Sequence, residues 1–248
     1  AKVAGASVVS INPLFETGMR RFKHPQNPLE VIGQGTTIAD MHVPVNVNGD
    51  LALFRGLSKS IISGSGIDYN FISKYTSGYD EYERAVADSS WDEIVSASGV
   101  ARHDIEKLAA AMRTSSSTIV CWAMGLTQHH NSVATIQEIA NTLLLGGHIG
   151  RPGAGLCPVR GHSNVQGDRT VGINHKPSRG FLDSLRNTTG IDTPFNHGYD
   201  SVNSVLAMLD GRAKVFLSMG GNFVSAMSDT DSTSRAIQSC DLSVQIST

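Results

Sequence analysis

Short runs of apolar residues alternate along the chain with longer stretches in which apolar residues recur at helical spacing. The clearest run covers residues 118–124, where a nearly unbroken apolar sequence is typical of a strand buried on both faces. Similar but shorter runs predict further strands, at residues 6–11, 37–45, 213–218 and 242–246. Strands therefore occur throughout the chain, separated by other segments.

The separating segments place apolar residues three and four positions apart. One begins at Asp50 and puts Leu53, Leu57 and Ile61 on one face, as in an amphipathic helix. Further helices are predicted at residues 69–75, 79–87, 91–96, 102–113, 132–145, 201–209 and 232–239. Strands that alternate with helices are typical of an α/β fold with a doubly wound, mainly parallel, Rossmann-like sheet.

Three stretches lack this periodicity. Residues 14–35 are rich in proline, glycine and basic residues and predict a long surface loop. Residues 150–174 are glycine-rich and irregular, and residues 175–198 are polar. The change in composition near residues 150–175 predicts a boundary between two partial lobes, one at residues 1–160 and the other at 161–248.

Composition and charge exclude several classes of function. The 248 residues are 40% hydrophobic, enough to fill the core of a globular protein. The formal net charge of −2 favours neither nucleic acid nor an anionic membrane surface as a partner. Apolar runs fall far short of a bilayer span, so we expect no membrane insertion, and no leader peptide is recognisable.

The cysteines and histidines predict no metal site. Cys121, Cys157 and Cys240 are far apart in sequence, and an odd, unclustered set is typical of free thiols in a reducing compartment. We therefore expect a cytoplasmic location. The chain begins without methionine and ends in a strand-like run, which suggests an internal piece of a longer protein.

Polar or glycine-rich turns follow several predicted strands. Asn12, residues 125–131 and residues 220–223 all occupy such positions, and ligands of open α/β sheets bind beyond the carboxyl ends of strands. Ordinary tight turns are the alternative interpretation of each. None matches G-x-G-x-x-G or a P-loop, which argues against a nicotinamide dehydrogenase or a standard nucleotide triphosphatase.

Residues 158–172 carry an unusual density of polar side chains. Arg160 and Arg169 flank Asn164, Gln166 and Asp168. The planar arginine fork binds carboxylate or phosphate, and side-chain amides can bind the edge of a heterocycle. This set fits a large polar ligand with anionic groups and a ring system, although a solvated loop has the same composition.

Several of these stretches belong to one family pattern. They are residues 37–42 (TIADMH), 121–128 (CWAMGLTQ), 147–155 (GHIGRPGAG), 158–167 (PVRGHSNVQG) and 219–222 (MGGN). In this order they resemble the molybdopterin oxidoreductases, and within them the formate-dehydrogenase-like large subunits. The resemblance covers nearly the whole chain.

The resemblance implies a molybdenum or tungsten ion held by two molybdopterin guanine dinucleotides between two α/β lobes. The chain would then contain part of each lobe of this core. The protein ligand to the metal, and an iron–sulfur cluster in members that carry one, would precede residue 1. The implied substrate is formate or a similar small anion, and a redox partner would exchange electrons with the enzyme. We expect the chain alone to be inactive.

The resemblance also assigns roles to residues. Arg160 would lie beside the metal and steady an anionic substrate. His162 stands where glutamine is expected in formate dehydrogenases, and it either moves protons or packs as an ordinary loop histidine. The positions that would line the cofactor are Asn12, Asp50, Gly125, Gln128, Asn164, Gln166, Gly167, Gly220 and Asn222. Asp50 has two interpretations, an acceptor for a guanine edge and a helix cap.

An alternative function remains open at this point. The chain could be a non-catalytic α/β module that binds a guanine nucleotide or a partner protein. Nucleotide binding without turnover would be the sign of such a module.

Overall fold

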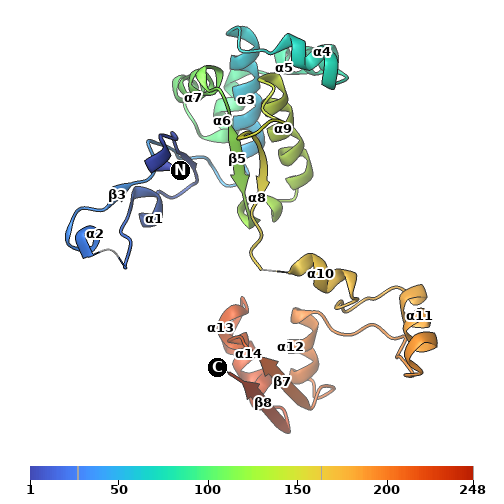
Figure 1. The fold of residues 1–248 in the computed structure, drawn as a ribbon. Coiled ribbons are helices and arrows are strands. Elements are labelled where there is room, and N and C mark those ends of the chain that lie inside the picture. The colour runs from blue at the N-terminus through green and yellow to red at the C-terminus, as the bar shows by residue number, and fades with distance from the viewer. Residues whose placement is uncertain (27, 163, 248) are drawn as a thin grey trace. The chain divides into compact units, whose positions relative to one another are not determined.

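The computed structural model describes residues 1–26, 28–162 and 164–247. The chain divides into two compact units, residues 1–161 and 162–248. Figure 1 colours it from blue at the N-terminus to red at the C-terminus. Each unit has its own cluster of buried hydrophobic residues, so each can be understood from its own packing.

Helices form most of the first unit. Their bounds are η1 (Lys2–Ala4), α1 (Thr17–Arg20), α2 (Pro28–Ile32), α3 (Asp50–Ser63), α4 (Tyr69–Tyr75), α5 (Tyr79–Ala87), α6 (Trp91–Ser98), α7 (Arg102–Thr114), α8 (Met124–Thr127) and α9 (Ser132–Leu145). Helix α3 contacts α5, α6, α7 and α9. It is therefore the central helix of this unit.

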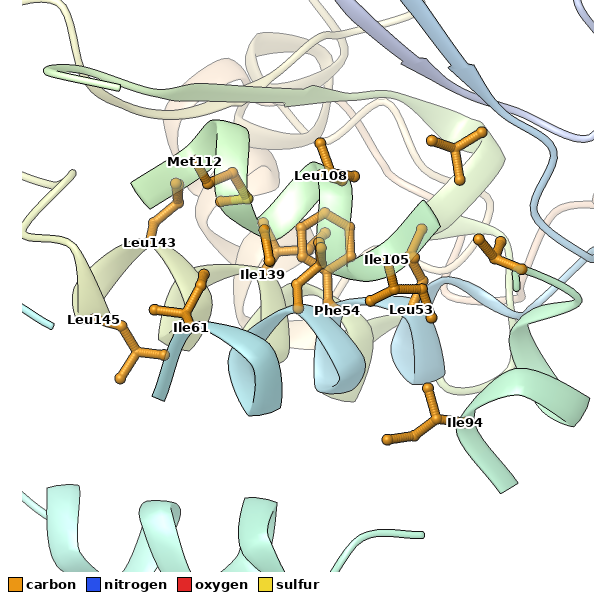
Figure 2. Packing of buried hydrophobic residues seen from close by; sticks show 14 of the residues in the cluster. Leu53, Phe54, Ile61, Ile94, Ile105, Leu108, Met112, Ile139, Leu143 and Leu145 are labelled. Carbon is orange, nitrogen blue, oxygen red and sulfur yellow. The ribbon is translucent and has the colours of Figure 1, made fainter. Parts of the chain in front are cut away.

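The core of the first unit lies where α3, α7 and α9 meet (Figure 2). Leu53 and Leu57 of α3, Ile105 of α7, and Ile139 and Leu143 of α9 are fully buried. These positions recur every three or four residues along each helix, so one apolar face of each helix is removed from water. Burial of each such side chain contributes roughly 1.5–3 kcal/mol.

A buried polar network crosses this helical core. The Glu138 carboxylate of α9 accepts hydrogen bonds from Arg55 on α3, at 2.9 Å, and from the Tyr82 hydroxyl on α5, at 2.7 Å. The Tyr82 hydroxyl also lies 2.8 Å from that of Ser58, which in turn lies 2.8 Å from that of Thr142. Burial raises the pKa of Glu138, whereas its bonds to Tyr82 and Arg55 lower it. The network compensates part of the desolvation of a buried carboxylate.

The strands of the first unit pair two by two. Strand β1 (Val9–Ile11) pairs in parallel with β4 (Met41–Val43), and β5 (Ile119–Trp122) pairs in parallel with β6 (Gly155–Pro158). A short antiparallel pair joins β2 (Arg21–Phe22) to β3 (Thr36–Thr37). Val120 and Trp122 face the helical core. The alternate residues of β5 therefore lie on the opposite face of the strand, away from that core.

Within the described residues of the second unit, one parallel pair of strands packs against helices on one face. Strand β7 (Val215–Met219) pairs with β8 (Leu242–Ile246), and Phe216 packs with the core residues Val205, Met208 and Ala236. The helices are α10 (Val165–Thr170), α11 (Arg179–Thr189), α12 (Ser201–Leu209), α13 (Phe223–Ala226) and α14 (Thr230–Gln238).

Short side chains cap four of the described helices of the second unit, among them α11, α12 and α14. Ser178 caps α11, Asp200 caps α12 and Asp229 caps α14, each by accepting a hydrogen bond from a backbone N–H of the first turn. Such caps satisfy backbone donors that have no partner inside the helix. They explain why these helices begin where they do.

The predicted α/β class with mainly parallel strands is confirmed, and so are most of the predicted helices. Within the described residues, however, the strands form separate two-stranded pairs rather than one continuous sheet. The predicted strand at residues 37–45 is wrong in extent, because β3 and β4 are separate and pair with different partners.

Three stretches without periodicity contain regular structure, contrary to the prediction. Residues 14–35 hold α1, β2 and α2, and residues 150–174 hold β6 and α10. Residues 175–198 hold α11, an amphipathic helix that buries Leu182. Strand β6 is four residues long and contains glycine and proline, so its pairing with β5 rather than its own propensity determines it.

Candidate functional site

The candidate site residues of the first unit follow its strands. Asn12 comes directly after β1, and its backbone N–H donates to the carbonyl of Val43 at 3.2 Å, which extends the β1–β4 pairing by one residue. The chain after β4 leads to Asp50, the first residue of α3. Asn12 therefore follows a strand and Asp50 begins a helix, as the sequence predicted.

Asp50 is buried, with 6% of its surface exposed. The interpretation of Asp50 as a helix cap is wrong in position, because Gly49 occupies the cap and Asp50 lies inside the first turn. Burial raises the pKa of the Asp50 carboxyl, while a hydrogen bond from its own backbone N–H and the charge of His129 lower it. The groups around Asp50 thus compensate only part of the desolvation of its carboxyl.

The turn after β5 carries Gly125 and Gln128. Gly125 lies in the short helix α8 with open space on the side where a Cβ would be. The exposed Gln128 side chain contacts the Met124 sulfur at 3.6 Å. Both residues are therefore accessible at the end of β5.

Three polar groups that sequence reasoning missed are buried without a partner. Nδ1 of His42, Nδ1 of His129 and Oδ1 of Asn131 have no hydrogen-bond partner among the described residues. Buried polar atoms are nearly always paired, so these three atoms have unused hydrogen-bonding capacity. The polar run Thr127–Asn131 after a strand was the signal in the sequence, but its burial depends on tertiary packing.

These groups belong to two neighbourhoods. His42 lies on β4, and its ring stacks on that of Phe15 with 4.5 Å between the ring centroids. His129 and Asn131 lie in the turn between α8 and α9, where His129 is close enough to Asp50 to influence its charge. The Asp50 neighbourhood therefore contains a carboxylate and the imidazole of His129, and the unpartnered amide oxygen of Asn131 belongs to the same turn as His129.

Arg160 follows β6 and is exposed. The N–H of the preceding Val159 donates to the carbonyl of Trp122 at 2.7 Å, which continues the β5–β6 pairing to the end of both strands. A Cβ at Gly161 would lie 3.0 Å from the Met124 methyl group. The segment that carries Arg160 therefore passes beside α8, which carries Gly125.

The second unit holds the other candidates, first among them the residues of α10. His162 is exposed, and Ser163 lies outside the described residues. Asn164 occupies the cap position of α10, and its side chain lies against Gly167, where a Cβ would approach Asn164 to 2.4 Å. Gln166 is exposed in the first turn. Glycine at position 167 is thus required for this placement of Asn164.

Gly220 and Asn222 follow β7, as expected for a strand end. Gly220 adopts a φ of 73°, and its N–H donates to the Ile246 carbonyl at 2.9 Å. Oδ1 of Asn222 accepts a hydrogen bond from the N–H of Ser225 at 3.1 Å and so caps α13. Among the described residues, the side-chain amide nitrogen of Asn222 has no such partner and could donate to a ligand.

A model of one protein family matches residues 4–247, and its description is "Molybdopterin oxidoreductase". The chain belongs to the molybdopterin oxidoreductase family. Membership implies a molybdopterin cofactor that carries molybdenum or tungsten. Within the described ranges no cluster of three or more histidine, cysteine, aspartate or glutamate side chains could hold a metal ion.

Relatives in this family are much longer than this chain. It is 47% identical to "Uncharacterized oxidoreductase Rv2900c" of Mycobacterium tuberculosis, with 100% of the chain and 33% of the relative covered. It is 32% identical to "Formate dehydrogenase H" of Escherichia coli over 54% of the chain and 19% of that enzyme. The chain therefore spans about a third of the length of the first of these relatives.

A solved structure supports the fold assignment. Acetylene hydratase from Pelobacter acetylenicus aligns with 98% of the chain and 35% of its own length, at a TM-score of 0.56 and 17% sequence identity. At this identity the likeness concerns the fold alone. Across the described residues, no helix of this family member is both long and apolar enough to span a bilayer.

Proposed function

We propose that this chain supplies part of the cofactor-binding core of a molybdenum or tungsten oxidoreductase that uses two molybdopterin guanine dinucleotides. The chain spans about a third of the relative's length, so we propose activity for a longer protein and none for the chain alone. The observations that carry the proposal are the buried Asp50 carboxyl, the charge of His129 that acts on it, and the buried, unpartnered polar atoms of His129 and Asn131 in one turn.

The chemistry of this set fits a guanine base. Guanine presents N–H donors beside O6 and N7 acceptors. The Asp50 carboxylate and the amide oxygen of Asn131 can accept from such donors, and a protonated His129 nitrogen can donate to an acceptor. The buried position of Asp50 strengthens each of these hydrogen bonds. We therefore assign Asp50, His129 and Asn131 to one guanine.

Glycines and amides at the other strand ends suit the remainder of the cofactor. Gly125 and Gly220 follow β5 and β7 and offer exposed backbone. Asn12, Gln128, Asn164, Gln166, Gly167 and Asn222 complete the proposed lining. Close approach of the backbone and amide hydrogen bonds are suited to a polar pterin and its phosphates.

When bound, the molybdopterin cofactor supplies oxidation and reduction chemistry at its metal. Arg160 is exposed after β6, and we propose that its guanidinium binds the carboxylate of formate or a similar small anion. We propose His162 as a proton carrier near the substrate.

The metal ligand is proposed to lie outside this chain, as is any iron–sulfur cluster, and an electron-transfer partner would complete turnover. We further propose a cytoplasmic location, because three cysteines that form no disulfide are typical of a reducing compartment.

Titration of the purified chain with GDP by calorimetry tests the guanine assignment. We expect saturable binding that Asp50→Asn weakens at least about tenfold, since an amide nitrogen cannot accept from guanine donors. The control is Asp92→Asn, because Asp92 is an exposed acidic residue in the first turn of α6. Absence of binding at millimolar GDP, or equal weakening by both variants, would refute the assignment.

A further inference from the structure

Cys121 and Cys157 lie side by side although they are far apart in the sequence. They are directly opposed in the register of the parallel strands β5 and β6. Neighbouring strands are about 4.8 Å apart, and a disulfide requires Cα atoms roughly 4.4–6.8 Å apart. All three thiols are free, as expected, but two of them lie on paired strands, and the backbone spacing of this pair already suits a disulfide.

Both thiols are on the accessible face of the strand pair. Directly opposed residues of parallel strands point to the same side. The neighbouring positions Val120 and Trp122 face the helical core, so Cys121 and Cys157 face away from it, and both are exposed. A small oxidant can therefore reach them without unfolding of the unit.

The protonation of the Cys121 thiol slows its reaction with oxidants. Partial burial raises the pKa of the Cys121 thiol, and the neighbouring Cys157 thiol raises it further. Thiolate is the reactive form of cysteine, so the Cys121 thiol reacts slowly near neutral pH. In the reducing conditions of a cytoplasm such a pair stays reduced until a suitable oxidant accumulates.

We propose that Cys121 and Cys157 form a redox-sensitive dithiol that closes into a disulfide across β5 and β6. The co-reactant is a small disulfide of the glutathione class. One thiolate attacks its S–S bond to give a mixed disulfide, and the second protein thiolate displaces the remaining glutathione. One S–S bond breaks and one forms, two electrons pass to glutathione, and the two protons end on its two thiols.

Closure would fasten the two strands from which candidate site residues extend. Strand β5 leads directly into α8, which carries Gly125, and β6 ends two residues before Arg160. The disulfide would close the loop of residues 122–156 and restrict the unfolded chain more than the folded one. Oxidation should therefore stabilise the first unit and hold these two segments together.

Incubation of the 248-residue chain with oxidised glutathione, followed by intact-mass analysis and peptide mapping, tests the proposal. We expect loss of two hydrogen atoms per chain and a peptide pair linked through Cys121 and Cys157. Cys240→Ser serves as the control, because Cys240 belongs to the second unit, and it should close as the natural chain does. In the Cys240→Ser background, Cys121→Ser and Cys157→Ser should instead retain a single glutathione adduct.

A second measurement uses phenylarsine oxide, which binds pairs of close thiols and releases water without any oxidation. It should label the natural chain and the Cys240→Ser variant once, block disulfide closure in both, and fail to bridge either of the other variants. The urea midpoint of the oxidised chain should rise and return on reduction. A linkage to Cys240, disulfide-bonded dimers instead of closure, or closure without a rise in midpoint would each overturn the proposal.

Discussion

His129 lies close enough to Asp50 for its charge to act on a carboxyl group that is buried at the start of α3. The two residues come from segments almost eighty positions apart, and the packing of α9 on α3 brings them together. Burial of a carboxylate without full compensation opposes folding. The arrangement is therefore poor for stability and well suited to a ligand that completes its hydrogen bonds.

The first prediction concerns the stability of the Asp50→Asn variant. Because the folded pKa of Asp50 is raised, the folded state binds this proton more tightly than the unfolded state. At a pH above the pKa of Asp50 in the folded protein, the ionised carboxylate therefore lowers the free energy of unfolding. This penalty disappears when the pH falls below the pKa of Asp50 in the unfolded chain. We expect Asp50→Asn to stabilise the chain at pH 7, by on the order of 1 kcal/mol, and to lose this advantage near pH 3.5.

Urea denaturation at several pH values measures this effect. Both tryptophans, Trp91 and Trp122, lie in the first unit, so their fluorescence follows the unit that contains Asp50. The Asp92→Asn control should change the midpoint little at either pH. An Asp50→Asn variant that is less stable at pH 7 than the natural chain would mean that the carboxylate is a structural group. Higher stability together with lost GDP binding would mark it as a binding group.

The elements that the sequence predicted well are those with their own strong pattern. Helices α3 and α9 have long apolar faces and clear ends, and their predicted bounds agree with the structure. Strand β6 and helix α10 are short and contain glycine, so tertiary pairing decides them and local propensity does not. The same limit applies to α11, whose few apolar residues are interrupted by polar ones.

The candidate site was predictable only in part for the same physical reason. Strand ends could be read from the pattern, so Asn12, Gly125 and Gly220 fall where expected. The burial of His129 Nδ1 and Asn131 Oδ1 could not be read in this way, because a polar turn is normally solvated and its burial depends on tertiary packing. The proximity of two distant cysteines likewise depends on strand register, which no single segment encodes.

The second prediction concerns the buried network around Glu138. Tyr82→Phe removes a hydroxyl that donates to the Glu138 carboxylate at 2.7 Å and leaves one carboxylate oxygen with fewer partners. A hydrogen bond to a charged, buried group contributes about 2 kcal/mol, so we expect a loss of this size in urea denaturation. The control is Tyr75→Phe, because Tyr75 is 65% exposed, and its effect should be within about 0.5 kcal/mol. Equal effects of the two variants would contradict a stabilising role for the network.

The third prediction concerns the close approach of α6 and α7 to Gly56. A Cβ at this position would lie 2.9 Å from the Ile94 methyl group and 3.1 Å from that of Ile105. Gly56→Ala gains about 1 kcal/mol in helix propensity, but overpacking of a core costs roughly 1–3 kcal/mol. We expect a net loss of about 1 kcal/mol by tryptophan fluorescence in urea. Gly18→Ala in α1, where a Cβ meets open space, has no overpacking to offset its gain in helix propensity and should not lower the midpoint. A stabilised Gly56→Ala variant would show that α3 can shift freely.

The fourth prediction separates nucleotide binding from catalysis and rests on the proposed function. We expect the purified chain to bind GDP but to carry no stoichiometric molybdenum and to show no oxidation of formate with a dye acceptor. The physical reason is that the protein ligand to the metal is proposed to lie outside the chain. Metal analysis and the dye assay are made on the same preparation, with Asp50→Asn as the variant that lacks the nucleotide site.

Turnover with bound metal would show that these residues suffice for catalysis. GDP binding without turnover in a full-length homologue would instead favour a non-catalytic guanine-nucleotide module, because the missing residues could then no longer explain the lack of activity.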